Sequence, residues 1–166
     1  MLTIGVLSDT HGSCPGEVFE VLDGCDFIIH AGDIGRGVLE DLRAIAPVIA
    51  VLGNNDYPSQ YPGLDYFASP SFEGVRFLVS HTPVALTAAQ RGNRGVLSPG
   101  DPLPHVAIHG HTHVPNLERG MVGNPGGWLL CPGSVSRPRG GSKRTVAKIV
   151  IDKGAVKSVK LIQLGL

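Results

Sequence analysis

Short apolar runs recur along this chain, and each is followed at once by Asp, Asn or His. The runs have the length and composition of β-strands. They are Leu2–Leu7, Phe27–Ile29, Val48–Leu52, Val75–Val79 and Val106–Ile108. The motifs that follow them are Ser8-Asp9-Thr10-His11, Gly32-Asp33, Gly53-Asn54-Asn55-Asp56, His81 and Gly110-His111-Thr112-His113. Because strand ends can meet in space, we expect these polar residues to form one site.

The first third of the chain alternates between strands and helices. Pro15–Leu22 and Val38–Ala46 show the apolar spacing of helices and separate the first three strands. Pro47 ends the second helix. This β-α-β-α-β order predicts parallel strands joined by right-handed crossovers.

The rest of the chain is predicted to be rich in hairpins. Tyr66–Phe72 and Val75–Ser80 flank Glu73-Gly74, which suits a tight turn. A short helix is predicted over Pro83–Gln90 and a surface loop over Arg91–Pro104. Later strands are predicted over Met121–Val122, Trp128–Leu130, Thr145–Ile151 and Val156–Leu164. Together these elements predict one α/β domain over residues 1–166, with two packed sheets and helices outside them.

The composition is that of a globular domain. A chain of 166 residues with 42% apolar residues can bury a sizeable core. Its net charge of zero removes the simplest argument for a nucleic-acid polymer or an anionic membrane as partner. No apolar run approaches the roughly 20 residues of a membrane span. Three cysteines without CxxC spacing favour the reducing cytoplasm.

Charge is distributed unevenly along the chain. Residues 1–132 hold 6 Lys/Arg and 13 Asp/Glu, whereas residues 133–166 hold 8 Lys/Arg and 1 Asp. A basic segment, residues 137–144, contains Arg137, Arg139, Lys143 and Arg144. A solvated loop explains most of these cations; the alternative is that one or two contact an anionic substrate.

Each polar motif also has an ordinary structural explanation. Asp9 and His11 fit a polar strand end, and on an extended strand their side chains share a direction. Asp33 fits a helix N-cap, Asn54 a turn, and His81 the rim of the core. The combination of motifs is more specific for a metal site than any single motif. The pair His111 and His113, two residues apart, strengthens that interpretation. The candidate metal ligands are Asp9, His11, Asp33, Asn54, His81, His111 and His113.

The number and type of these residues favour two ions. One ion cannot use seven protein ligands and still admit a substrate. Two ions that share Asp33, with about four protein ligands each and roughly 3.5–4 Å apart, can do so. A nitrogen and oxygen set without thiolate favours a catalytic pair, with Mn as the first expectation and Ni, Fe, Co or Zn as alternatives.

Three further histidines have two possible explanations. His30 and His109 lie beside ligand segments and could support a ligand by hydrogen bonding. A satisfied core histidine explains both more simply, and His105 is expected near the surface.

With these motifs in place, the chain resembles the calcineurin-like metallophosphoesterase superfamily over almost its whole length. The matching segments are SDTHG at 8–12, HAGD at 30–33, GNND at 53–56, SH at 80–81, GHTH at 110–113 and PGSVSRPR at 132–139. The short length and the last segment resemble the small YfcE-type phosphodiesterases of bacteria and archaea. The resemblance implies a four-layer α-β-β-α sandwich of two mixed β-sheets flanked by helices.

The resemblance also implies how the ligands divide. One ion would take Asp9, His11, Asp33 and His113, and the other Asp33, Asn54, His81 and His111. Many relatives have a proton-donating His, and the YfcE-type often has Cys, where this chain has Asn55; Cys131 stands where the family often has Asn.

The sequence therefore predicts a metal-dependent phosphodiesterase acting on a small phosphoester. A hydroxide bridging the ions would attack phosphorus, with Asn55, Asp33 and His81 in the catalytic machinery. A phosphomonoesterase and a nucleotide polyphosphate hydrolase are alternatives. A protein-binding scaffold is another, since the retromer vacuolar-sorting subunit resembles this fold; a homo-oligomer is left open.

Overall fold

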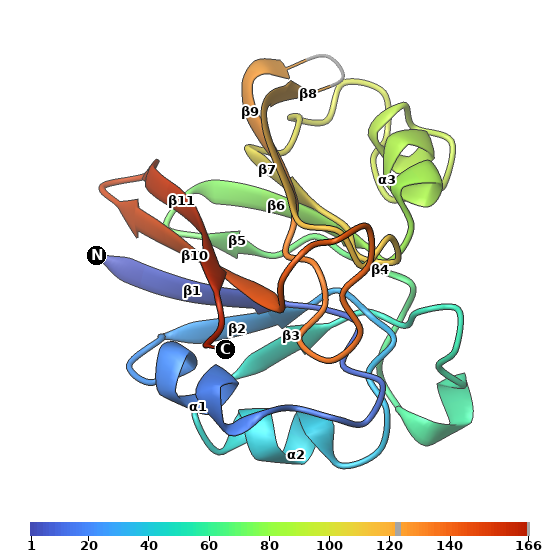
Figure 1. Ribbon diagram of the computed structural model, residues 1–166. Coiled ribbons are helices and arrows are strands. Elements are labelled where there is room, and N and C mark those ends of the chain that lie inside the picture. The colour runs from blue at the N-terminus through green and yellow to red at the C-terminus, as the bar shows by residue number, and fades with distance from the viewer. Residues whose placement is uncertain (122–123, 166) are drawn as a thin grey trace.

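The computed structural model describes residues 1–121 and 124–165, whose strands form two mixed β-sheets (Figure 1). The first sheet has the strand order β11-β10-β1-β2-β3. Its strands β1, β2 and β3 are parallel, as the alternating first third predicts, while β10 and β11 are antiparallel additions. The strands are β1 (Leu2–Leu7), β2 (Phe27–His30), β3 (Val48–Ala50), β10 (Thr145–Asp152) and β11 (Ala155–Gln163).

The second sheet has the order β4-β6-β7-β9-β8, and β5 also pairs with β6. Strands β6, β7 and β9 are parallel. Strands β4 and β5 are antiparallel to β6, and β8 is antiparallel to β9. The strands are β4 (Phe67–Ala68), β5 (Ser71–Phe72), β6 (Val75–Ser80), β7 (Val106–Ile108), β8 (Asn116–Met121) and β9 (Asn124–Cys131).

Helices lie outside both sheets and complete the predicted four-layer α-β-β-α sandwich (Figure 1). Helices α1 (Gly16–Leu22) and α2 (Val38–Arg43) pack on the first sheet, and α3 (Pro83–Gln90) packs on the second. A 3-10 turn, η1 (Pro58–Gln60), follows β3. Among the described residues, no helix combines the length and apolarity needed to cross a bilayer.

The alternation of side chains along β6 shows how the layers are held together. Phe77 and Val79 point into the core between the two sheets, whereas Leu78 points outward and packs against Leu86 of α3. All four side chains are almost completely buried. A strand with apolar residues on both faces is typical of a sheet covered on both sides.

Several predicted boundaries are wrong for local reasons. The strand predicted over Tyr66–Phe72 is two short strands, because Pro70 has no N–H for the ladder. The strand predicted over Val48–Leu52 ends at Ala50, since the Leu52 N–H donates to the Asp65 carbonyl instead. The helix predicted to reach Ala46 ends at Arg43.

The strands after the GHTH segment are longer than predicted. β8 covers Asn116–Met121, where only Met121–Val122 was expected, and Val122 itself lies outside the described residues. β9 extends over Asn124–Cys131 rather than Trp128–Leu130. Pro125 and two glycines at its start carry no apolar periodicity, so the sequence gives no strand signal there. Lys153 and Gly154, both with positive φ, form the tight turn between β10 and β11.

Candidate metal centre

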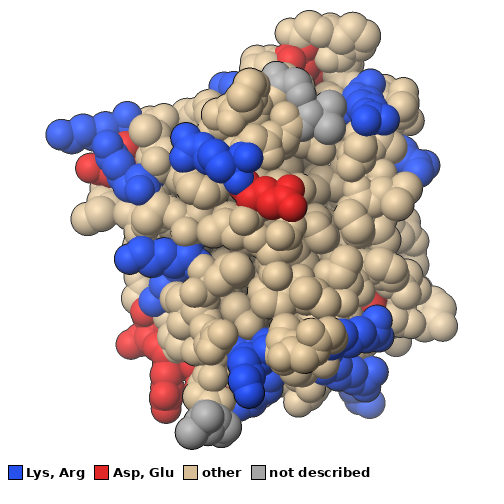
Figure 2. Space-filling model, turned by 45° about the horizontal axis from the view of Figure 1, so that its top comes forward, with Lys and Arg blue, Asp and Glu red and all other residues tan. Residues whose placement is uncertain are grey.

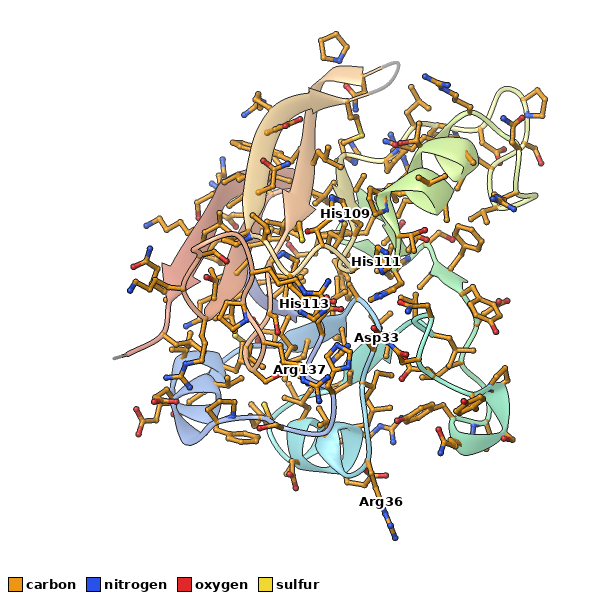
Figure 3. The ribbon with its side chains drawn as sticks, turned by 45° about the vertical axis from the view of Figure 1, so that its right-hand side comes forward. Asp33, Arg36, His109, His111, His113 and Arg137 are labelled. Atoms are coloured by element: carbon orange, nitrogen blue, oxygen red, sulfur yellow. The ribbon has the colours of Figure 1, made fainter. Side chains whose placement is uncertain are left out.

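The loops that follow the parallel strands of both sheets meet at one edge of the sandwich. Asp9 follows β1, Asp33 follows β2, His81 follows β6, and His111 and His113 follow β7. Figure 3 shows Asp33, His111 and His113 around one centre, with Arg137 nearby and Arg36 pointing away. The expected convergence of strand-end residues is therefore present.

Backbone hydrogen bonds continue the sheet pairing into these loops. The Asp9 N–H donates to the Gly32 carbonyl and the His11 N–H to the Asp33 carbonyl, each at 3.0 Å. Between the sheets, the Gly110 N–H donates to the His81 carbonyl at 2.9 Å. The loops are thus fixed to one another through main-chain atoms, independently of the side chains in the centre.

Five of the seven candidate ligands have left-handed backbone conformations. Asp9, His11 and Asp33 have φ of 53°, 48° and 55°, and His111 and His113 have φ of 73° and 60°. The expectation that Asp9 and His11 share a direction on an extended strand is therefore wrong, because both lie in a loop beyond β1. Left-handed non-glycine residues of this kind concentrate at functional sites, where surrounding structure holds them.

Two carboxylates and three imidazoles surround the centre. Asp9 Oδ1 lies 3.2 Å from His113 Nε2, 3.7 Å from His81 Nε2 and 3.9 Å from His11 Nε2. Asp33 Oδ2 lies 3.4 Å from His81 Nε2 and 3.6 Å from His11 Nε2. Oxygen and nitrogen atoms at such spacing can hold a metal ion, both in the group Asp9, His11 and His113 and in the group Asp9, Asp33 and His81.

The rings of His81 and His113 are oriented by backbone carbonyls. Nδ1 of His81 donates to the Ala31 carbonyl, and Nδ1 of His113 donates to the Arg137 carbonyl, both at 2.7 Å. A carbonyl only accepts, so each Nδ1 holds the proton and each Nε2 faces the centre with its lone pair. Within the described chain, His81 Nε2 and Asp9 Oδ1 are buried without a hydrogen-bond partner. These inward-facing electron pairs fit a bound cation.

The outer part of the centre is more exposed. His111 Nδ1 lies 3.1 Å from Asn54 Oδ1, and the His111 N–H donates to Asp9 Oδ2 at 3.0 Å. The His111 and His81 rings are 5.2 Å apart, centroid to centroid. The structure therefore brings all seven candidate ligands together, with a buried inner part and an accessible outer part.

Asn55 contacts the same carboxylate that was predicted to bridge two ions. Its side-chain Nδ2 donates to Asp33 Oδ2 and its backbone N–H donates to Asp33 Oδ1, each at 2.9 Å. The residue is exposed, so it also faces solvent and any substrate. Asp33 is not the helix N-cap that its sequence position allows, because Gly37 occupies that place in α2.

The centre attracts positive charge. Burial would raise the pKa of the Asp33 carboxyl, but the neighbouring His81 imidazole and the hydrogen bond from the Asn55 N–H hold that pKa below its ordinary value. Burial would lower the pKa of His81, but Asp33 and Asp9 raise it above its ordinary value. A proton and a metal ion therefore compete for His81 Nε2, the nitrogen that faces the two carboxylates.

Asp56 is the most important residue that the sequence reasoning missed. Its carboxylate accepts the N–H groups of Asp33, Ile34 and Gly53 at 2.8, 3.0 and 2.7 Å, and it is buried. It thereby joins the loop after β2 to the loop after β3. A Cβ at Gly53 would lie 2.2 Å from Asp33 Oδ1, so this close approach requires glycine. In the sequence, the GNND segment resembled an ordinary turn, which hides this function.

Serine hydroxyls tie the loop after β9 to the centre. Ser134 Oγ donates to the Asp9 carbonyl at 2.7 Å, and Ser136 Oγ donates to the Thr10 carbonyl at 2.8 Å. Ser8 Oγ donates to Asp9 Oδ2 at 2.7 Å. These contacts explain the PGS segment structurally, and its hydrogen-bond partners, which lie far away in the chain, cannot be predicted from the segment itself.

The remaining histidines are explained by hydrogen bonding and burial. His30 accepts the Gly32 N–H at Nδ1 and contacts the Thr10 hydroxyl at 3.0 Å through Nε2. Burial lowers its pKa to about 3, so it is a neutral core histidine. His109 is also buried, and its Nδ1 donates to the Gly110 carbonyl at 2.8 Å. His105 is half-buried and accepts the Arg76 N–H at 2.9 Å.

The basic segment 137–144 divides between structural and site-facing residues. Arg144 pairs with Glu17 of α1 at 3.2 Å and so fastens the segment. Arg137 is exposed beside the centre. The pKa of His11 lies below its ordinary value, because burial and the charge of Arg137 together outweigh the opposing effect of Asp33. Figure 2 shows Lys and Arg in separate groups on the face it draws, rather than in one continuous track.

Comparison with known proteins identifies relatives over most of the chain. Residues 2–154 match the family model of the calcineurin-like phosphoesterase superfamily domain. A probable metallophosphoesterase of Methanocaldococcus jannaschii is 31% identical, with 96% of this chain and 82% of that protein covered.

Solved structures share the fold. An archaeal phosphodiesterase has a TM-score of 0.74 at 24% identity and covers 98% of this chain and 100% of its own. Zinc-bound Vps29 from Entamoeba histolytica has a TM-score of 0.72 at 18% identity, covering 98% of each chain. The phosphoesterase YfcE from E. coli has a TM-score of 0.65 at 22% identity, covering 99% of this chain and 100% of its own.

Replacing Asp56 by Asn should destabilise the protein without removing a candidate ligand. The amide of Asp56→Asn offers one acceptor atom where three N–H donors need two. We expect the free energy of unfolding to fall by about 1–3 kcal/mol, the cost of a buried unsatisfied donor. Urea denaturation measures it. Asp101→Asn, an exposed carboxylate that accepts one N–H from Ser98, is the control, and equal losses in both variants would contradict the role of Asp56.

Proposed function

The chain belongs to the calcineurin-like phosphoesterase superfamily, and we propose that it is a phosphodiesterase dependent on two divalent metal ions. The observation that carries the proposal is the convergence of Asp9 and Asp33 on inward-facing histidine nitrogens. Buried carboxylates opposite imidazole lone pairs are a ligand set for borderline divalent ions. Mn is the proposed metal, with Ni, Fe, Co and Zn as alternatives.

We further propose how the ligands divide. Asp9, His11 and His113 hold one ion, and Asn54, His81 and His111 hold the other. Asp33 serves both, which its position supports, because Asp33 Oδ2 lies within 3.6 Å of a histidine from each set. Asp9 Oδ1 is also within 3.7 Å of His81, so Asp9 adds negative charge to the second set.

The residues of the centre have distinct tasks in this proposal. Bound divalent ions supply Lewis acidity and lower the pKa of a coordinated water. His81 and His113, oriented by carbonyls, present fixed lone pairs. The neutral histidines and two aspartates leave two divalent ions with a net charge near +2, which attracts a phosphate anion. Asn55 orients Asp33 and the substrate, but its amide has no proton to give near neutral pH.

The rival functions differ in what they require of the centre. A phosphomonoesterase or a nucleotide polyphosphate hydrolase can use the same ligands and differs in substrate. A protein-binding scaffold does not need the metal ligands, and the fold is also that of Vps29, whose name indicates no esterase activity. Hydrolysis is favoured here because all seven candidate ligands are present and converge.

The wider setting is proposed on simpler grounds. One core draws residues from both sheets, which supports a single domain over residues 1–166. Cys25 and Cys131 are buried free thiols, which supports a cytoplasmic location. The proposed partner is a small phosphoester.

Metal removal should abolish hydrolysis. Treatment with a chelator removes the ions that neutralise the phosphate, and adding Mn should restore the rate of bis(4-nitrophenyl) phosphate hydrolysis. Release of nitrophenolate is followed by absorbance, with metal content measured on the same samples. Full activity in protein shown to be free of metal would exclude a metal-dependent mechanism.

Asp33 should be the most damaging ligand to replace. Asp33→Asn keeps the size of the side chain but removes the charge that both ions share. We expect fewer than two bound Mn per chain and almost no turnover, measured by metal analysis and by kcat. The matched control is Asp101→Asn, which is far along the chain in an exposed loop. A normal rate with two bound ions in Asp33→Asn would contradict the bridging role.

Asn55→His should improve esters with poor leaving groups. An imidazolium can donate a proton that an amide cannot, and general acids typically contribute about 10²–10⁴-fold. The gain should be largest for leaving groups of high pKa, so kcat/KM plotted against leaving-group pKa should become less steep. Asn55→Ala, which also loses the bond to Asp33, is the control and should keep the original slope. Equal slopes in wild type and Asn55→His would mean that residue 55 does not govern protonation.

A further inference from the structure

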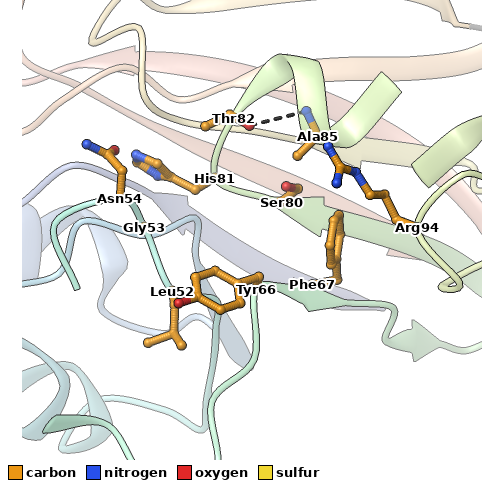
Figure 4. Close-up of a pocket in the computed structure, with 10 residues that line it drawn as sticks. All are labelled: Leu52, Gly53, Asn54, Tyr66, Phe67, Ser80, His81, Thr82, Ala85 and Arg94. Carbon is orange, nitrogen blue, oxygen red and sulfur yellow. Dashed lines mark hydrogen bonds between the residues drawn. The ribbon is translucent and has the colours of Figure 1, made fainter. Parts of the chain in front are cut away.

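A cavity of 380 Å³ lies directly beside the candidate metal centre (Figure 4). His81 and Asn54 belong to both, so a group bound at the centre can extend into the cavity without crossing another element. The cavity lies where the loop after β3, the start of β4 and the end of β6 face the first turn of α3.

The far walls of the cavity are mainly apolar. Phe67 of β4 stands opposite Ser80 of β6, and opposed residues of an antiparallel pair share a face of the sheet. Ala85 of α3 also lines the cavity, and so does Tyr66, which has 49% of its surface exposed. Thr82 is already engaged, since its hydroxyl accepts the Ala85 N–H at 3.2 Å. Such walls favour an apolar group over a sugar or a second phosphate.

The size and the aromatic walls together indicate the occupant. An apolar cavity of roughly 150 Å³ is large enough to bind benzene, so 380 Å³ holds a ring together with its linking atoms. Tyr66 and Phe67 offer ring surfaces, and the Arg94 guanidinium can stack on a flat π-system. We propose that this cavity, the ring pocket, binds an aromatic ring of the substrate, so that the preferred substrates are phosphodiesters with an aromatic ester group.

The position of Asn55 decides which ester group the ring pocket takes. Asn54 lines the ring pocket, whereas Asn55 lines a separate cavity together with Gly35 and Tyr57. The two ester groups of one phosphorus can therefore lie on opposite flanks, and the leaving group is assigned to the Asn55 side, where the Asn55 amide can donate a hydrogen bond to its oxygen. The ring pocket then holds the group that stays on phosphorus. This assignment rests on the proposed phosphodiesterase function.

The test uses two diesters with the same leaving group. Phenyl 4-nitrophenyl phosphate and methyl 4-nitrophenyl phosphate each take up water, break the bond from phosphorus to the nitrophenyl oxygen, and release 4-nitrophenolate and a phosphate monoester. With Mn, wild type should prefer the phenyl ester. Ala85→Phe fills the ring pocket, and we expect the phenyl-to-methyl ratio of kcat/KM to fall about tenfold or more, as one methylene in an apolar enzyme pocket is worth roughly 10–200-fold.

The matched control is Val84→Phe, at the position of α3 that precedes Ala85. Val84 is 75% exposed and does not line the ring pocket, so its ratio should equal that of wild type. If circular dichroism shows that Ala85→Phe does not fold, Phe67→Leu, which removes an aromatic wall, provides the same test. A ratio unchanged in the pocket variants would overturn the proposal.

A binding measurement separates failure of the pocket from failure of the function. Diphenylphosphinate and dimethylphosphinate have P–C bonds that do not hydrolyse, and calorimetry gives their Kd on Mn-loaded protein. Diphenylphosphinate should bind more tightly to wild type and to Val84→Phe than to Ala85→Phe. Equal binding to all three, with hydrolysis intact, would refute the ring pocket alone. Absence of metal-dependent hydrolysis of every ester would refute the phosphodiesterase function instead.

A third ester identifies the source of the ring. Thymidine 5′-(4-nitrophenyl phosphate) has the same leaving group but places its ring beyond a sugar. If its kcat/KM falls more than that of the phenyl ester in Ala85→Phe, the occupant is a nucleobase. If the phenyl ester loses more, the occupant is a ring attached directly to the ester oxygen.

Discussion

Two buried carboxylates set the requirements that the rest of this structure meets. Asp9 and Asp33 lose nearly all contact with water, and a buried charge is costly unless hydrogen bonds or an opposite charge compensate it. Backbone N–H groups of His111 and Asn55 bind one oxygen of each. The other oxygens, Asp9 Oδ1 and Asp33 Oδ2, face imidazole nitrogens, and of the two only Asp33 Oδ2 accepts a further hydrogen bond, from the Asn55 amide, so a bound cation fits this environment. The candidate metal centre is where this compensation takes place.

Holding those carboxylates in place requires unusual backbone. Left-handed residues turn the chain after β1, β2 and β7, and Gly53 and Gly110 allow neighbouring loops to approach more closely than any Cβ permits. Asp56 binds three N–H groups of two loops and fixes their relative position. Hydrogen bonds that involve main-chain groups therefore position the loops that carry the ligands. Such a pre-organised frame loses little conformational freedom on binding, which favours affinity.

The same frame leaves substrate choice to elements outside it. The fold is shared with a phosphodiesterase, a phosphoesterase and Vps29 at identities below 25%, so the sandwich alone does not define an activity. In this chain the candidate metal centre has Asn55 on one flank and apolar walls from β4 and α3 on the other. An enzyme can keep its ligands and change its substrates by changing these flanks.

The sequence by itself determined the chemistry and the layer order. Periodic apolar runs predicted the parallel strands and their helices, and the residue types at the strand ends predicted a nitrogen and oxygen site, because those patterns are local in the chain. Tertiary structure alone decided the rest. The directions of Asp9 and His11 come from left-handed turns, and the function of Asp56 comes from donors about twenty residues away. The ring pocket joins the loop after β3 to β4, β6 and α3. Contacts between distant segments depend on how whole sheets pack, which no short stretch of sequence encodes.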